Sequence, residues 1–149
     1  MTKRLLICVL GALLATACAT REHRLPDPTR PQVFVAPGDY LVLNQEPILI
    51  LRKPGQEAKI TWRVGDGTVF ERDGITIIGR VKTGGRNPER LDRPDPSQNQ
   101  LFKCSSSENR LEFTCVIDGK VQAGQYAYAV NVARGGKRIV LDPTIMIRD

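Results

Sequence analysis

The chain has 149 residues, of which 41% are hydrophobic and 5% aromatic, and its 22 basic and 16 acidic residues give a net charge of +6. This length suits one domain with its own core, and two domains would be cramped. The basic residues are scattered and few aromatic residues lie among them, which is unlike a nucleic-acid-binding surface. We therefore expect no nucleic-acid partner.

The first 17 residues have the three parts of a secretory signal. A basic start at residues 3–4 is followed by an apolar run at 5–14 and by small residues at 15–17, directly before Cys18. With a cysteine at this position, the segment resembles a bacterial lipoprotein precursor. The resemblance covers the signal alone. It implies cleavage before Cys18, acylation of Cys18 and, because Ala19 follows instead of Asp, attachment to the outer membrane facing the periplasm.

Two alternatives compete with this interpretation of the N-terminus. An uncleaved membrane helix is disfavoured, because residues 5–17 are too few for the span of about 20 apolar residues that a bilayer core requires. The second alternative is an ordinary cleaved signal, because Ala15 and Ala17 fit the small residues that a general signal peptidase prefers. Cleavage of that kind would release a soluble periplasmic or secreted protein.

The segment that follows the signal is predicted to be a tether. Residues 19–31 contain three prolines, five charged residues and one large apolar side chain, too little to form a core. We therefore expect residues 18–31 to be a lipidated, flexible linker that holds the domain up to about 40 Å from the membrane at about 3.1 Å per residue. Residues 32–149 are the expected folded domain. The mature chain of 132 residues would carry a net charge of +4.

From residue 33 onward, apolar residues recur with a period of two, which is typical of half-buried strands. Four such faces are Ala58, Ile60, Trp62 and Val64; Ile75, Ile77, Gly79 and Val81; Leu111, Phe113, Cys115 and Ile117; and Tyr126, Tyr128, Val130 and Val132. Continuous apolar runs at 41–43 and 48–51 predict strands that are covered on both sides or lie at a bend. Residues 138–148 predict one or two further strands, broken at Asp142-Pro143. Turn signals separate the runs at Pro37-Gly38-Asp39, Pro54-Gly55, Gly65-Asp66-Gly67, Asp73-Gly74, Asp118-Gly119 and Gly135-Gly136.

Roughly eight short strands in one small exported domain predict an all-β fold, a single antiparallel β-sandwich. Trp62, in the middle of an alternating run, is expected at the centre of the core. The sandwich is immunoglobulin-like in style only. In antibody domains the two bridged cysteines lie far apart in sequence, and here ten residues separate Cys104 from Cys115.

Cys104 and Cys115 are the two cysteines that remain when the signal is removed and Cys18 carries the lipid. In an oxidising compartment we expect them to form a disulfide. If they face each other in an antiparallel ladder, Phe102 falls opposite Ile117 on the same apolar side. In the chain-entropy model such a bridge stabilises the fold by about 2–3 kcal/mol.

Residues 84–100 resist the strand interpretation, because they contain three prolines and almost no apolar side chains. Loops of this length are usually functional or disordered. Arg86, Arg90 and Arg93 could bind an anionic glycan, a lipid headgroup or an acidic protein, since guanidinium groups match carboxylate and phosphate. The alternative is that acidic residues of the same loop neutralise them.

Residues suited to catalysis or metal binding are few. The single histidine, His23, lies in the predicted tether, so the domain lacks the base of a Ser–His–Asp or Cys–His set and the ligands of a zinc or copper site. Asp66, Glu71 and Asp73 are close in sequence and could serve a hydrolase. However, Asp66 and Asp73 each precede a glycine in a predicted turn, where Asp is favoured for backbone reasons. We expect no cofactor and no metal.

The sequence therefore predicts a lipid-anchored cell-envelope protein that presents a small β-sandwich for protein–protein interaction, for example as an accessory part of an envelope or secretion assembly. The alternative is a periplasmic module that binds a glycan or another anionic ligand through the loop at 84–100. An envelope hydrolase that uses Asp66 or Asp73 is the least favoured hypothesis.

Overall fold

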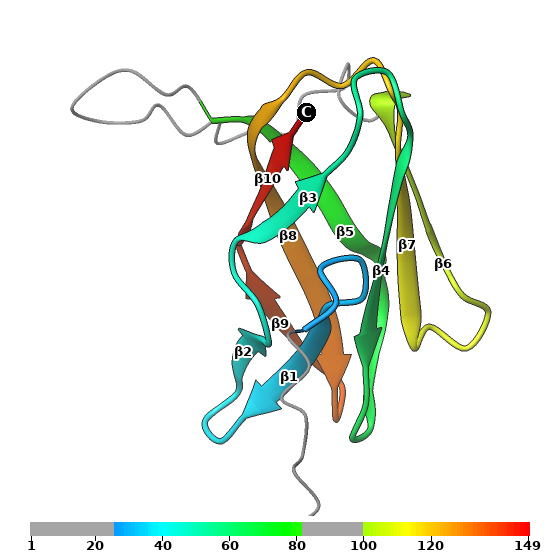
Figure 1. Cartoon of the computed structure of the whole chain (residues 1–149). Coiled ribbons are helices and arrows are strands. Elements are labelled where there is room, and N and C mark those ends of the chain that lie inside the picture. Colours follow the sequence, from blue (N-terminus) through cyan, green and yellow to red (C-terminus); the bar gives the residue numbers. More distant parts are fainter. Residues whose placement is uncertain (1–25, 82–99) are drawn as a thin grey trace, which may run out of the picture.

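The computed structural model describes residues 26–81 and 100–149, most of which lie in β-strands (Figure 1). The strands are β1 (Gln32–Ala36), β2 (Tyr40–Leu43), β3 (Ile48–Leu51), β4 (Ala58–Val64), β5 (Thr68–Arg80), β6 (Phe102–Ser106), β7 (Glu112–Ile117), β8 (Gly124–Arg134), β9 (Lys137–Leu141) and β10 (Thr144–Arg148). The break that the sequence predicts at Asp142-Pro143 separates β9 from β10.

The strands form two sheets that pack face to face (Figure 1). One sheet has the order β2-β1-β4-β7-β6, and the other has the order β3-β10-β8-β5, with β9 paired to the C-terminal part of β8. This arrangement confirms the predicted all-β sandwich. Most neighbours are antiparallel, but β1 runs parallel to β4 and β3 runs parallel to β10. Parallel neighbours cannot be joined by a tight hairpin, and the period-two pattern of the sequence does not reveal these two pairings.

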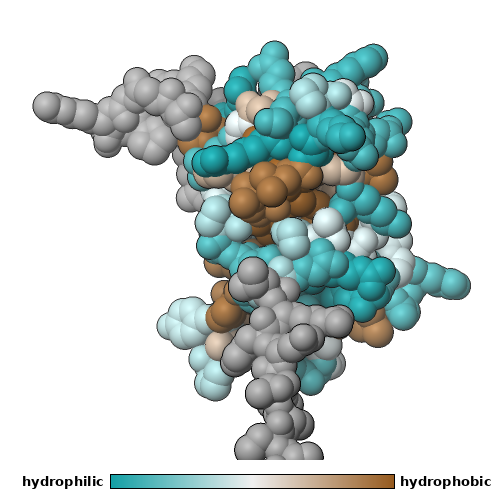
Figure 2. All heavy atoms as spheres, in the orientation of Figure 1, coloured by the Kyte–Doolittle hydropathy of each residue, from teal (hydrophilic) through white to brown (hydrophobic). Residues whose placement is uncertain are grey.

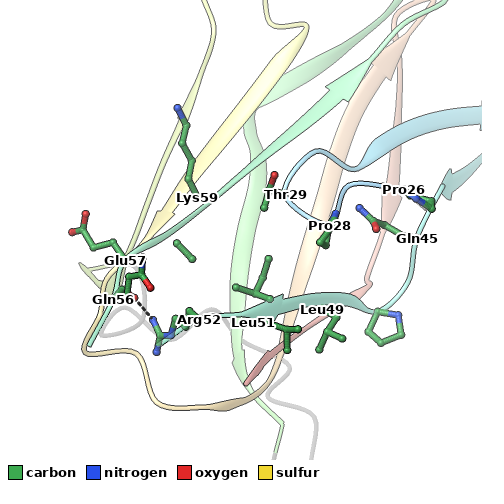
Figure 3. Close-up of a pocket in the computed structure, with 13 residues that line it drawn as sticks. Pro26, Pro28, Thr29, Gln45, Leu49, Leu51, Arg52, Gln56, Glu57 and Lys59 are labelled. Atoms are coloured by element: carbon green, nitrogen blue, oxygen red, sulfur yellow. Dashed lines mark hydrogen bonds between the residues drawn. The ribbon is translucent and has the colours of Figure 1, made fainter. Parts of the chain in front are cut away.

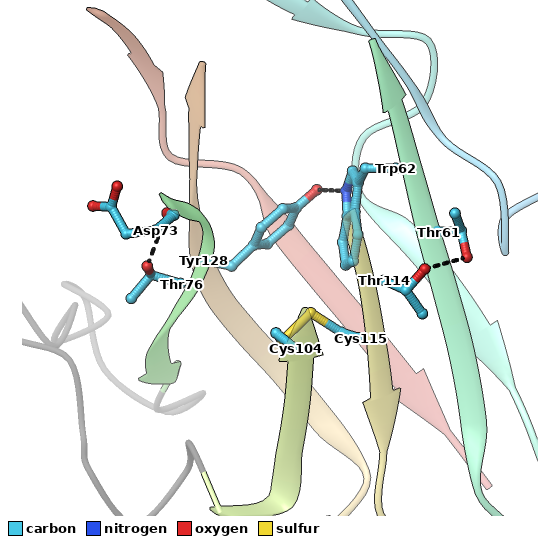
Figure 4. Close-up of a disulfide and its surroundings, with 8 residues drawn as sticks. All are labelled: Thr61, Trp62, Asp73, Thr76, Cys104, Thr114, Cys115 and Tyr128. Carbon is cyan, nitrogen blue, oxygen red and sulfur yellow. Dashed lines mark hydrogen bonds between the residues drawn. A yellow bond between two sulfur atoms is a disulfide. The ribbon is translucent and has the colours of Figure 1, made fainter. Parts of the chain in front are cut away.

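The core between the sheets contains the side chains that the alternation predicted. Buried members of the four predicted faces are Ile60, Trp62, Ile75, Ile77, Phe113, Cys115, Ile117, Tyr126, Tyr128, Val130 and Val132. Trp62 is fully buried, and its Nε1–H donates a hydrogen bond of 3.2 Å to the hydroxyl of Tyr128 (Figure 4). Burial raises the pKa of Tyr128, so this hydroxyl stays protonated. Tyr126 and Tyr128 are therefore core residues.

The hairpin of β6 and β7 has the register that the two cysteines predict. Cys104 lies opposite Cys115, Phe102 lies opposite Ile117, and the Cys104–Cys115 disulfide is formed (Figure 4). The centroid of the Phe102 ring lies 5.4 Å from the centroid of the Tyr126 ring, which belongs to the other sheet. The cysteine side of the hairpin therefore faces the core.

The turn predicted at Asp73-Gly74 is wrong. These residues lie inside the 13-residue strand β5, where the pairing with β8 shifts register between Phe70 and Ile75. Gly74 is required by close packing, since a Cβ atom there would lie 2.7 Å from Cδ2 of Phe113. Sequence reasoning also missed the buried Phe70, because the supposed turn divided its strand. The other five predicted turns fall between strands.

The two continuous apolar runs are not covered on both sides. In β2 and β3 alternate residues are buried, and the residues between them are exposed. Both strands stand at the end of a sheet in the strand order. Their outward apolar side chains are Tyr40, Val42, Leu49 and Leu51.

The described end of the predicted tether lies against the domain. Residues 26–31 include a turn in which the Arg30 N–H donates to the Asp27 carbonyl. The carbonyls of Thr29 and Pro31 accept hydrogen bonds from backbone N–H groups of β4. The contacts of the domain therefore begin a few residues before β1.

Candidate functional site: an apolar groove beside β3

Most of the site residues that the sequence suggested lie outside the described residues. These are Cys18, the proposed lipid site, and the loop arginines Arg86, Arg90 and Arg93. The structure therefore neither places them nor brings them together. Of the predicted covalent features, the Cys104–Cys115 disulfide is present.

The three carboxylates considered for acid–base chemistry do not form a cluster. Asp66 lies in the turn between β4 and β5 with a positive φ of 53°, which explains an aspartate there by backbone conformation. Asp73 lies within β5, and its Oδ2 is 2.8 Å from a guanidinium nitrogen of Arg138. Within residues 26–81 and 100–149, no group of three or more potential metal ligands is found.

A groove of about 630 Å³ lies between β3 and the first part of β4 (Figure 3). Its walls are mostly apolar or uncharged, and they come from the segment before β1, from β3 and the residues on either side of it, and from the start of β4. The lining residues are Pro26, Pro28, Thr29, Gln45, Pro47, Leu49, Ile50, Leu51, Arg52, Gln56, Glu57, Ala58 and Lys59. Figure 2 shows an apolar area of the surface at the place of β3, bordered by hydrophilic residues.

The exposed apolar surface of this groove comes from the position of β3 at the end of its sheet. Ile48 and Ile50 point into the core, so Leu49 and Leu51 must point to the other face. Leu49 is 40% exposed and Leu51 is 72% exposed. Exposed leucines that adjoin a groove are typical of an interaction surface, whereas isolated ones need no explanation.

Arg52 closes one end of the groove. Only 2% of its side chain is exposed, and its Nε donates to the Asp149 carboxylate at 2.9 Å. Its other guanidinium nitrogens donate to the carbonyls of Gln56, Asp118 and Val121. The bond to Gln56 spans the turn between β3 and β4 (Figure 3), and the others tie this turn to Asp118, Val121 and Asp149.

The backbone of β3 presents free hydrogen-bonding groups to the groove. The N–H of Arg52 donates to the Arg148 carbonyl on β10 at 3.1 Å. Because backbone groups alternate in direction along a strand, those of Leu49 and Leu51 point away from β10. Within the described part of the chain, no backbone partner for Leu49 or Leu51 is found on that side.

The start of β4 presents one more pair of free backbone groups. The N–H groups of Thr61 and Arg63 donate to the carbonyls of Thr29 and Pro31 and therefore point away from β7. By the same alternation, the backbone of Lys59 points to the groove side. The described residues supply no backbone partner for it there.

Two other surface features of the described residues are a hollow beside β6 and a half-exposed apolar pair on β1 and β2. A hollow of about 380 Å³ between β5 and β6 is lined by both apolar and charged residues, including Cys104 and Lys103. Phe34 and Val42 are half-exposed neighbours on the β1–β2 pair. Neither place combines exposed apolar side chains, a groove and free backbone groups.

Sequence reasoning missed the groove, although the sequence contains a signal for it. The four consecutive apolar residues Ile48–Leu51 make both faces of a strand apolar, and prolines lie on either side of the run at Pro47 and Pro54. Such a run can be buried on both sides or exposed at an edge. The composition alone does not distinguish these two cases.

Comparisons with known proteins give no family for this chain. No protein-family model matches it, and no curated protein has a significantly similar sequence. Within the described residues, no helix has the length and apolar character to cross a membrane.

Proposed function

We propose that this protein is a lipid-anchored component of the bacterial cell envelope that binds a protein partner through the groove beside β3. The observation that supports binding is the groove itself, with two exposed leucines on one wall and free backbone groups on both. The anchor is supported by the N-terminal segment that ends at Cys18. Attachment to the outer membrane, facing the periplasm, is part of the same proposal.

The chemistry of the groove favours a polypeptide over an anionic ligand. The side chain of Arg52, which is 2% exposed, already donates to a carboxylate and three carbonyls. The remaining charges on the lining, Glu57 and Lys59, are of opposite sign. Apolar walls of this kind gain free energy by covering apolar side chains, at about 25 cal/mol per Å² buried.

The alternative of a glycan-binding module depends on Arg86, Arg90 and Arg93. They lie outside the described residues, and no described feature favours that alternative. A hydrolase would need Asp66 or Asp73 in a reactive arrangement, and Asp73 instead faces Arg138. The groove therefore carries the proposal.

Site-specific photocrosslinking in intact cells tests whether the groove binds a protein partner. A photoreactive benzoyl-phenylalanine replaces Leu51 in the full chain, and a matched chain carries it in place of Val140, which is 51% exposed on β9 and outside the groove. We expect one discrete adduct with another envelope protein from position 51 and not from position 140. Identical adduct patterns from both positions, or none from position 51, would contradict the proposal.

A further inference from the structure

We infer that the groove binds its partner by β-strand addition, in which an extended apolar segment of another protein pairs with the free edge of β3. This inference rests on the proposed function and specifies how the partner is held. The backbone N–H and C=O groups of Leu49 and Leu51 point to the same side of β3. The occupant must therefore supply backbone donors and acceptors at the spacing of a strand.

The edge of β3 is short, but it has neither a charged side chain nor a proline within the strand to prevent strand pairing. Exposed edges are usually protected by short length, by charged side chains, by proline within the strand or by a covering segment. β6, at the end of the other sheet, carries the exposed Lys103, and β5 carries Glu71, Arg72 and Asp73. β2 has no charged residue, but it lies against β9. β3 contains four aliphatic residues and no charge.

The walls of the groove define the side chains that the added segment needs. Residues of a strand alternate between its two faces. One set would therefore lie beside Leu49 and Leu51, and the other would point into the groove toward Pro28 and Ala58. Both surroundings are apolar, so apolar residues are expected on both sides of the segment. A proline at a paired position would remove a donor and is not expected.

The size of the site favours a short segment of another protein over a second copy of this chain. β3 has four residues, which span about 13 Å at about 3.3 Å per residue. Pairing of β3 with β3 of a second copy would bury two short strands, far less than the roughly 800 Å² per partner of a stable interface. The groove of about 630 Å³ instead lies within the range of about 300–1,000 Å³ that is typical of ligand pockets, which suits a short segment.

A peptide library provides the probe. Random octapeptides displayed on phage are selected on the full-length mature protein in detergent, with the Leu49→Lys/Leu51→Lys variant used to remove peptides that bind elsewhere. We expect selected peptides to be rich in apolar residues and poor in proline. Failure to select any peptide that discriminates the two proteins would overturn the inference.

Backbone pairing is then tested directly on the selected peptides. N-methylation of alternate amides on one edge of the peptide should weaken binding at least tenfold, whereas N-methylation of the other alternate set should change it less than threefold. Equal effects of the two sets would show binding through side chains only. That result would overturn strand addition while leaving the partner adduct from position 51, and with it the proposed function, intact.

Variants of the protein give the reciprocal test. Leu51→Pro removes an N–H that faces the groove and not β10, so we expect it to fold and to lose at least tenfold in peptide affinity. Leu51→Lys provides the same readout if Leu51→Pro does not fold, with Val140→Lys as the matched control that keeps full affinity. A crosslinked adduct of twice the chain mass, or an internal crosslink to residues 19–25, would assign the groove to another occupant and overturn the inference.

Discussion

Arg52 joins three parts of the chain that are far apart in sequence. Its guanidinium contacts the C-terminal Asp149, the segment between β7 and β8 at Asp118 and Val121, and the turn that follows β3. A buried arginine is tolerated only when its donors are satisfied. The wall of the groove formed by β3 therefore depends on a polar network and not on apolar packing alone.

Replacing Arg52 should destabilise the fold strongly. Arg52→Met keeps much of the side-chain volume but removes the guanidinium. The carbonyls that now accept its hydrogen bonds would then have no donor, so we expect a loss of about 2–4 kcal/mol in the free energy of unfolding. The control is Arg63→Met, because the Arg63–Glu112 pair has side chains that are 44% and 43% exposed. We expect less than about 1 kcal/mol there. Urea denaturation followed by circular dichroism measures both, and equal losses would contradict the role assigned to Arg52.

The strand β5 illustrates how local sequence can mislead at the level of an element. Asp73-Gly74 has the composition of a turn, yet the strand continues through it with a shift of register. Gly74 is present because Phe70 and Phe113 pack against it, with their ring centroids 5.6 Å apart. The carbonyl of Asp73 accepts a hydrogen bond of 2.7 Å from the buried Asn131.

A methyl group at position 74 should therefore be costly. In Gly74→Ala the Cβ would lie 2.7 Å from Cδ2 of Phe113 and 2.9 Å from Cβ of Phe70. We expect a loss of about 1–3 kcal/mol in the free energy of unfolding, as for overpacked cores. The matched control is Gly65→Ala, where a Cβ would meet nothing within 4 Å. That variant should lie within about 0.5 kcal/mol of the parent protein.

The hairpin of β6 and β7 depends on its disulfide in a way that can be measured. Among the described strands, β6 pairs only with β7, and Cys104 links the two strands midway along their ladder. The double variant Cys104→Ala/Cys115→Ala should lose about 2–3 kcal/mol in the free energy of unfolding. Reductant should lower the stability of the parent protein by a similar amount. The double variant should not respond to reductant, and any response would show that another mechanism contributes.

The sequence predicts those elements whose signals are local. Alternation identified the buried faces of β4, β7 and β8, and the cysteine pair set the register of β6 with β7. The parallel neighbours of β1 and β3 were not predictable in this way, because they pair residues from distant parts of the chain. The groove was missed for the same reason. It exists because β3 is at the end of a sheet and because Arg52 reaches carbonyls more than sixty residues away.

At the scale of the whole molecule, the groove lies close to the proposed anchor. Pro26 lines the groove, and eight peptide units separate it from Cys18. Even a fully extended chain of that length spans no more than about 28 Å. The predicted stand-off of about 40 Å assumed a free segment through residue 31, whereas Thr29 and Pro31 hydrogen-bond to β4. A lipid on Cys18 would therefore present the groove near the membrane surface, where segments of other membrane-attached proteins are within reach.

Anchoring and partner binding should then be separable. Replacing Cys18 with Ala removes the thiol that would carry acyl chains, so we expect the variant to move from the membrane fraction to the soluble periplasmic fraction. We expect the intact mass of the parent protein to include the mass of its acyl chains. Purified, this variant should bind the selected peptides as the parent does. Leu49→Lys/Leu51→Lys should show the converse, with normal fractionation and no adduct from a crosslinker at a neighbouring groove position such as Ala58. If the Cys18 variant stays in the membrane fraction, the lipid is not what holds the protein there. A parent protein that is found in the soluble fraction without acyl chains would instead favour the ordinary signal cleaved after Ala17.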